Sequence, residues 1–250
     1  PMRSPLRFIV VAALLLVAFV LPSLVELVTD WWWFRELGYQ DNYTTVLGAQ
    51  ATLGGLAFAM SVTWLAAHLR VAAQTLPVES QVVSTPEGLT IALPARREMQ
   101  TIGLVVAAGA AGLAALYAAS SWQDFLGWRH GEPFGTTDPV LGYDVAFYVF
   151  TLPMLELVRS FWLVQVGVAA AGAGALYLLG GQMAVTPFGV RLGGRARRHL
   201  GLLGAAFLVL LAAGAWLDRP NTLLTPTGII RGAGYTDVHA RMPFALAEAA

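Results

Sequence analysis

Glu156 and Arg159 are two opposite charges, three residues apart, inside a largely apolar part of this 250-residue chain. Residues at this spacing lie on one face of a helix, so the carboxylate and the guanidinium can pair. Ionisable groups within membrane segments are candidates for function by default. We predict a Glu156–Arg159 ion pair near the outer end of an apolar helix, structural in role, with a transport site as the alternative.

A second candidate lies in "GAGYTDVHAR", residues 232–241, where Asp237 and His239 stand one residue apart. In an extended chain, both side chains would point to the same side and could bind a metal ion. Two ligands are too few for a site without further partners. The glycines do not continue into a dinucleotide-binding fingerprint either, because Asp237 occupies its last position. The pattern therefore favours a structural motif over a metal site.

The same motif is expected to be a non-helical connection that leads into a further, truncated helix near Met242. Pro220 discourages helix in the residues just before it, and turn-forming glycines follow. Asp237, His239 and Arg241 would then satisfy backbone groups or one another. A helix cap from Thr236 or Asp237 is also consistent with these residue types.

A third group of polar residues, Arg35 and Glu36, directly follows four aromatic residues in "DWWWFRELGY", residues 30–39. Tryptophan rings favour the headgroup layer of a membrane, which accommodates both an apolar ring and a polar N–H. This stretch is therefore expected where a first membrane helix leaves the bilayer, with Arg35 and Glu36 just outside.

Other chemistry is excluded by what the chain lacks. There is no cysteine, so disulfides, thiolate metal sites and cysteine nucleophiles are absent. No G-x-S-x-G elbow and no catalytic triad is found, and a net charge of zero offers no basic stripe for nucleic acid. The sequence predicts no cofactor, no nucleic-acid partner and no enzyme.

The elements that would position these residues are membrane helices. Hydrophobic residues make up 57% of the chain and charged ones only 12%, with a mean hydropathy of +0.64. A hydrocarbon core of ~30 Å needs about 20 helical residues, and several uncharged runs meet that length. The predicted fold is an all-α polytopic membrane bundle in residues 1–217, followed by an extracytoplasmic connection in 218–250. Helices are expected at about 8–28, 44–68, 101–121, 155–180 and 200–217.

The distribution of arginine predicts the orientation of this bundle. All fifteen basic residues are arginine, and nine of them fall in one alternating set of connections. The loop 185–199 holds the densest cluster. The positive-inside rule places that set in the cytoplasm, with the N-terminus inside and the C-terminal end of the segment outside.

Polar and small residues within the runs suggest how the helices meet. "AAGAAGLAA" (107–115) offers a small-xxx-small face, such as Ala108 with Gly112, that lets backbones approach closely. Gln50 and Gln165 are expected to be hydrogen-bond partners between helices. If they, or His68, faced a water-lined cavity, a carrier would be favoured instead.

Several long motifs resemble those of one family. They are "FRELGYQDNYTTVLGAQ" (34–50), "PFGTTDPVLGYDVAFYVFTLP" (133–153), "RARRHL" (195–200), "WLDRPNTLL" (216–224) and "GAGYTDVHAR". Together they resemble an uncharacterised (UPF-series) family of large bacterial multi-pass membrane proteins. The resemblance implies several N-terminal membrane helices followed by a large extracytoplasmic region, and it implies no catalytic residues.

These observations lead to one functional interpretation and one alternative. The chain is interpreted as the membrane-anchoring scaffold portion of an envelope protein in the bacterial cytoplasmic membrane. Its expected partners are the lipid bilayer and either other membrane subunits or its own missing C-terminal domain. The alternative is a segment of a transporter or channel.

Overall fold

A computed structural model describes residues 5–84, 90–187, 189–224, 226–227 and 230–249, and these residues confirm the all-α bundle. In this described part of the chain, the strands form three two-stranded antiparallel hairpins. The helical elements, in chain order, are α1 (Pro5–Glu36), α2 (Gln40–Ala73), α3 (Arg96–Ser120), α4 (Trp122–His130), η1 (Phe147–Thr151), α5 (Leu152–Leu179), α6 (Gly194–Leu224), η2 (Asp237–Arg241) and α7 (Met242–Ala249).

Four helical segments of the described chain are long and apolar enough to cross a membrane: α2, α3, the continuous η1–α5 segment and α6. Helix α1 also forms at the predicted place, but it is not among these four. Helices α1, α2 and α6 extend beyond the predicted ranges at both ends, whereas α3 and α5 begin earlier than predicted and end one residue before the predicted bound. The prediction counted uncharged residues, and a helix continues into flanking polar residues wherever its backbone bonds remain satisfied.

Residues 1–49 form one compact unit, which contains α1 and the first turns of α2. The aromatic run lies within α1, which continues past the predicted helix end at residue 28 through Arg35 and Glu36, both exposed. Gly38, at φ +77°, ends it, and the Tyr39 N–H donates to the Phe34 carbonyl at 2.9 Å. This 6→1 backbone hydrogen bond is typical of a Schellman C-cap, in which the residue just after the helix adopts the left-handed conformation.

Tyr43 fixes the packing within this unit. Its ring stacks on Phe34 with centroids 5.0 Å apart, and it lies 6.2 Å from the Trp31 ring. Its hydroxyl donates to the Leu27 carbonyl at 3.0 Å. Part of the aromatic run therefore joins α1 to the start of α2.

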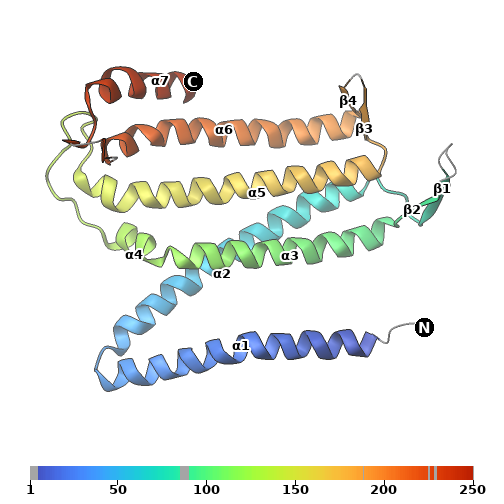
Figure 1. The fold of residues 1–250 in the computed structure, drawn as a ribbon, viewed down its shortest axis with the longest axis horizontal. Helices are drawn as coiled ribbons and strands as arrows, with labels where there is room; N and C mark the ends of the chain where they lie inside the picture. Colours follow the sequence, from blue (N-terminus) through green and yellow to red (C-terminus); the bar gives the residue numbers. More distant parts are fainter. Residues whose placement is uncertain (1–4, 85–89, 188, 225, 228–229, 250) are drawn as a thin grey trace. The chain divides into compact units, whose positions relative to one another are not determined.

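Residues 50–250 form the second unit, in which the rest of α2 lies with α3, α5 and α6 (Figure 1). Small residues allow close approach: a Cβ added to Gly54 would lie 3.3 Å from the Ala115 carbonyl oxygen. The buried alanines of α3 are Ala107, Ala111 and Ala118. The predicted face through Ala108 and Gly112 is therefore displaced by one residue, and a Cβ on Gly112 would meet open space.

The connections at the two ends of this unit differ in structure (Figure 1). One end carries two hairpins, β1–β2 (Gln81–Ser84 with Thr90–Leu93) and β3–β4 (Met183–Thr186 with Gly189–Leu192). The other end carries α4, the loop 131–146 and the short pair β5–β6 (Pro226–Thr227 with Ile230–Arg231). The hairpins were not predicted, because four-residue strands give little periodicity.

Helix α6 does not end near Trp216 but continues through Pro220 to Leu224. A proline within a helix removes one backbone bond, and in membrane helices neighbouring groups often compensate. Here the Thr222 hydroxyl donates to the Asp218 carbonyl at 2.6 Å, and Pro220 itself is buried. Helix α7 packs against α6 and runs alongside it (Figure 1).

Candidate functional site

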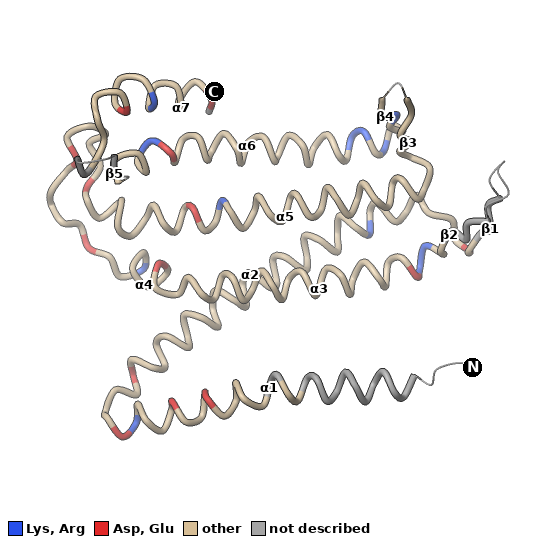
Figure 2. Tube along the Cα trace, in the orientation of Figure 1, with Lys and Arg blue, Asp and Glu red and all other residues tan. Residues whose placement is uncertain are grey.

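Glu156 and Arg159 do not pair with each other as predicted; each bonds to α6 instead. Arg159 Nε donates to the Leu210 carbonyl at 2.9 Å, and the Asn221 amide donates to the Glu156 carboxylate. Within the described residues, the ion pair that forms is Arg241–Asp237. Figure 2 shows the acidic and basic positions within α5, away from the charged helix ends. The spacing correctly placed both side chains on one face, but that face meets another helix.

Arg159 reaches the middle of α6. At about 1.5 Å per residue, about 24 Å of helix separates Gly194 from Leu210, and about 21 Å separates Leu210 from Leu224. The guanidinium fits because Gly214 has no side chain: an added Cβ would collide with three guanidinium atoms of Arg159. Arg159 is therefore a cation that contacts α6 near the midpoint of that helix, away from both of its ends.

A second polar contact joins α2 to α5. Gln165 is 2% exposed, and its side-chain oxygen accepts the Ser61 hydroxyl at 2.9 Å, with Ser61 fully buried. The Trp64 indole donates to the Gln165 carbonyl at 3.3 Å. The predicted role of Gln165 as a hydrogen-bond partner between helices is confirmed.

A third polar contact joins α2, α5 and α6. His68 Nδ1 lies 2.7 Å from His199 Nε2, and His199 Nδ1 lies 2.7 Å from the Tyr177 hydroxyl. The two imidazoles stack at 15°, and the Trp64 ring lies 4.2 Å from that of His68. Tyr177 is 1% exposed. The three side chains form one hydrogen-bonded chain across three helices.

The hydrogen bonds that link Tyr177, His199 and His68 can run in either direction. A neutral imidazole has one donor and one acceptor nitrogen, so the bonds can run from Tyr177 to His68 or in the reverse direction. In a full reversal the Tyr177 proton passes to His199 Nδ1 and the His199 Nε2 proton passes to His68 Nδ1, while His68 loses its Nε2 proton and Tyr177 gains a proton from outside these three side chains. Among the residues that the structure describes, no group of three or more His, Cys, Asp and Glu side chains could hold a metal ion.

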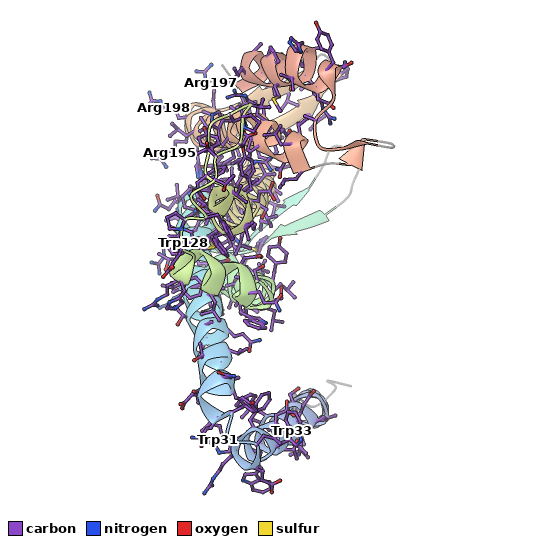
Figure 3. All side chains as sticks on the ribbon, turned by 90° about the vertical axis from the view of Figure 1, so that its left-hand side faces the viewer. Trp31, Trp33, Trp128, Arg195, Arg197 and Arg198 are labelled. Carbon is purple, nitrogen blue, oxygen red and sulfur yellow. The ribbon has the colours of Figure 1, made fainter. Side chains whose placement is uncertain are left out.

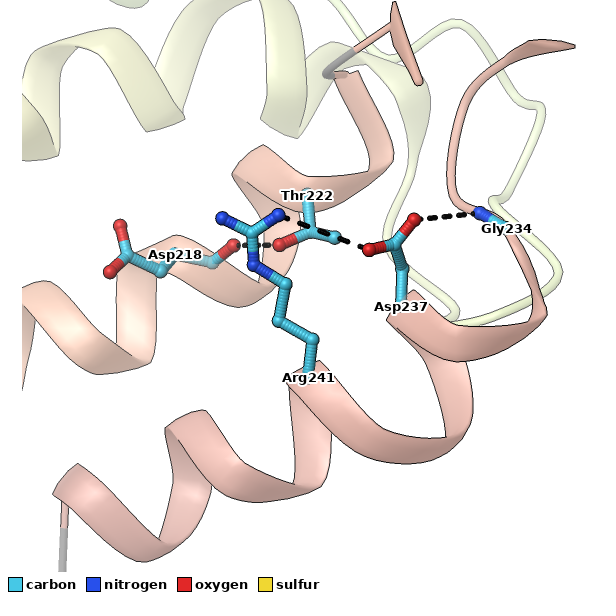
Figure 4. Close-up of polar contacts among 5 residues, drawn as sticks. All are labelled: Asp218, Thr222, Gly234, Asp237 and Arg241. Carbon is cyan, nitrogen blue, oxygen red and sulfur yellow. Dashed lines mark hydrogen bonds and ion pairs between the residues drawn. The ribbon is translucent and has the colours of Figure 1, made fainter. Parts of the chain in front are cut away.

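The motif "GAGYTDVHAR" is only partly the connection that was predicted, because it is helical from Tyr235 onward. The Asp237 carboxylate accepts the Gly234 N–H at 2.9 Å and lies 3.9 Å from the Arg241 guanidinium (Figure 4). An acidic side chain that reaches back over a helix start caps it. His239 bonds to the Tyr235 carbonyl at 3.0 Å.

These bonds confirm that the polar residues of the motif satisfy backbone groups and one another. Two residues apart on a helix, Asp237 and His239 do not point to one side, so the geometry assumed for a shared metal ion is wrong. The helix begins earlier than predicted because Asp237 supplies its cap, whereas the prediction took the glycines as the dominant signal.

The loop 131–146 is organised by two aspartates outside the membrane-spanning segments. Asp144 accepts backbone N–H groups from Phe134, Gly135 and Ala146 at 2.8–3.1 Å. These hydrogen bonds lower the pKa of Asp144, and the bond from the Ala146 N–H has the largest effect.

Asp138 organises the following turn. It accepts from Val140 and Leu141 N–H groups and from the Tyr148 hydroxyl. Partial burial alone would raise the pKa of Asp138, but these hydrogen bonds together lower it.

The loop should therefore lose order in acid. A carboxylate with a lowered folded pKa stabilises the fold above its unfolded pKa, about 3.9, and the contribution is lost as pH falls further. We expect the Phe134, Gly135 and Ala146 amides to be protected from hydrogen exchange at pH 6 and to be less protected at an acid pH well below ~3.9. Asp144→Asn should weaken protection at pH 6. Glu132→Gln in the same loop is the control, and equal wild-type protection at both pH values would contradict the interpretation.

The cavities of the described bundle are lined mainly by apolar side chains. One, of about 140 Å³, lies among α2, α3 and α5 and is lined by residues such as Leu53, Ala118 and Phe161. A more open groove runs beside Trp64 and His68. Gln165 borders a groove between α3 and α5 but bonds to Ser61 within the helix contact. The polar residues thus mainly bond to one another between helices.

Sequence reasoning missed Tyr177, His199 and Gly214. His199 carried a usable signal, since it directly adjoins an apolar run just as His68 lies within one. No sequence signal distinguishes Gly214 from the other glycines of α6, because its role depends on the arginine opposite.

The comparisons with known proteins agree on one family. The family described as "Uncharacterised protein family (UPF0182)" matches residues 7–250. The chain is 38% identical to a UPF0182 protein of Kineococcus radiotolerans over 87% of this chain and 22% of that protein. It is 35% identical to one from Geobacter sulfurreducens, over 95% and 27% respectively.

A UPF0182 protein of Cupriavidus necator is 33% identical over 97% of this chain and 28% of that protein. The chain thus spans about a quarter of the length of these curated relatives. No solved structure matches it. The motifs, the apolar helices and the match over residues 7–250 lead to one conclusion: the chain belongs to the UPF0182 family.

Proposed function

We propose that this segment is the membrane-anchoring scaffold of a longer bacterial envelope protein. Its partners would be the lipid bilayer and either the remaining three quarters of a full-length relative or other membrane subunits. The proposed cellular location is the cytoplasmic membrane, with the arginine-rich end of α6 in the cytoplasm. The arginine distribution supports this orientation.

The observation that carries the proposal is how the polar side chains between helices are used. Ser61 bonds to Gln165, His68 to His199, and Arg159 to the Leu210 carbonyl. Such contacts hold helices together where apolar surface gives no drive for association. Large apolar side chains remain exposed outward, including Leu113, Leu116, Leu202, Leu208 and Val209. A lipid environment suits those faces.

A carrier of protons or ions is the second candidate, and two observations favour it. Arg159 contacts α6 near the midpoint of that helix, and charge within a membrane segment usually marks a functional site. The chain from His68 through His199 to Tyr177 could exchange a proton. A carrier would need a further route connecting these groups to both sides of the membrane.

Flux measurements on the full-length protein separate the two functions. In liposomes loaded with a pH-sensitive dye, a scaffold adds no proton flux beyond that of protein-free liposomes under an imposed potential. The same sample should resist alkaline extraction from membranes. Proton flux that His199→Phe abolishes, while His130→Phe at an exposed position retains it, would establish the carrier and refute the scaffold as the sole role.

A further inference from the structure

The hairpin β3–β4 has an apolar face that extends beyond the bundle. Met183 pairs with Leu192, and Val185 pairs with Val190. Alternate residues of a strand share a face, so both pairs lie on the same side of the ribbon. Met183 and Leu192 pack against the main core, whereas Val185 is 72% exposed and Val190 55%. The valine pair thus continues the core-facing surface where protein no longer covers it.

Backbone bonds fix the base of this hairpin to α5. The Gln182 N–H donates to the Tyr177 carbonyl at 2.9 Å, and the Gly193 N–H donates to the Gln182 carbonyl at 2.7 Å. Near the turn, the Thr186 hydroxyl donates to the Gly189 carbonyl at 2.7 Å. The valine pair is consequently held at one place relative to the ends of α5 and α6.

Three exposed arginines follow the hairpin directly. Arg195, Arg197 and Arg198 project from the first turns of α6 (Figure 3), and in the described chain none of them forms an ion pair. Residues 181–199 contain no aspartate or glutamate. Further along α6 the exposed side chains become apolar, as at Leu202 and Leu208. A change from exposed cations to exposed apolar groups matches the boundary between lipid headgroups and acyl chains.

We propose that the hairpin β3–β4 and the first turns of α6 form a docking surface for anionic phospholipid headgroups. The guanidinium groups would bind lipid phosphates, for which their planar array of donors is suited. The valine pair would rest on the apolar part of the interface, which explains why this side of the ribbon is apolar without a protein neighbour. The inference rests on the proposed membrane anchor and adds a preference for lipid charge.

Native mass spectrometry of the detergent-purified full-length protein tests this preference, with phosphatidylglycerol and phosphatidylcholine offered together. The wild type should retain phosphatidylglycerol selectively. Each arginine near an anionic surface contributes enough that Arg195→Gln with Arg198→Gln should weaken this binding about 30-fold. Val185→Ser with Val190→Ser should weaken the retention of both lipids. Arg35→Gln with Arg129→Gln, exposed arginines elsewhere in the chain, is the matched control and should bind as the wild type does.

Three outcomes would overturn the proposal: equal retention of the two lipids, an unchanged preference in Arg195→Gln with Arg198→Gln, or an equal loss in the matched control. Displacement of phosphatidylglycerol by millimolar inorganic phosphate would assign the arginines to free phosphate instead. Circular dichroism confirms that each variant keeps its helices. Failure of the membrane anchor itself would be distinct, because the wild type would then be released by alkaline extraction.

Discussion

Gly214→Ala should destabilise the bundle, whereas Gly204→Ala on the same helix should leave its stability unchanged or raise it. Alanine in a helix interior is ordinarily favoured over glycine by about 0.5–1 kcal/mol. A Cβ at position 214 would displace the Arg159 guanidinium, which would then lose its bond to the Leu210 carbonyl. A Cβ at position 204 would meet open space. We expect a net loss of about 1–3 kcal/mol for Gly214→Ala, from a charged group left without its partner.

A double-mutant cycle in detergent identifies the cause of that loss. Unfolding free energies are measured for Gly214→Ala, Arg159→Met and the two combined. If the guanidinium is the group displaced, Gly214→Ala should cost nothing in the Arg159→Met background. Additive effects of the two substitutions would show that the close approach of Arg159 to Gly214 has been misassigned.

His199→Phe should have the second large effect. It removes the central member of the chain, so Tyr177, which is 1% exposed, loses the partner of its hydroxyl, and His68 loses the partner of Nδ1. A buried polar group without a partner costs about 1–3 kcal/mol. The change keeps an aromatic ring, so packing is largely retained. We expect a loss of about 2 kcal/mol in the free energy of unfolding.

Two further variants check this expectation. His130→Phe changes an exposed histidine of α4 and should leave stability within about 0.5 kcal/mol. Tyr177→Phe should remove one of the two bonds and cost less than His199→Phe. If His199→Phe unfolds at the wild-type denaturant concentration, the hydrogen-bonded chain does not contribute to the fold.

The helices could be predicted from the sequence because long apolar runs without charge indicate membrane helices. The runs around 44–68 and 200–217 lie within α2 and α6 as observed. Their ends could not be predicted from apolarity, because polar residues extend the helices. At Pro220 the local preference against helix is offset by the Thr222 hydroxyl bond to the Asp218 carbonyl and by burial.

For the candidate site, the sequence predicted which residues share a face of one helix, but not which other helix that face contacts. Spacing placed Glu156 and Arg159 together, but which helix they meet depends on tertiary packing. Likewise His68 was visible as a polar residue in an apolar run, while its contact with His199 joins residues far apart in the chain. The cap at Asp237 is the exception, since it is local and its residue type indicated it.

Cysteine accessibility in intact cells tests the central claim, that these helices anchor the protein across the membrane with the arginine-rich end inside. Single cysteines replace Gly194, at the start of α6, and Glu132, in the loop at the opposite end of the bundle. The full-length protein would carry no other cysteine, and an impermeant maleimide reagent would be added outside. We predict labelling at position 132 in intact cells and at position 194 only after permeabilisation. Labelling of position 194 but not position 132 in intact cells would contradict the orientation, and equal labelling of both would contradict the membrane anchor.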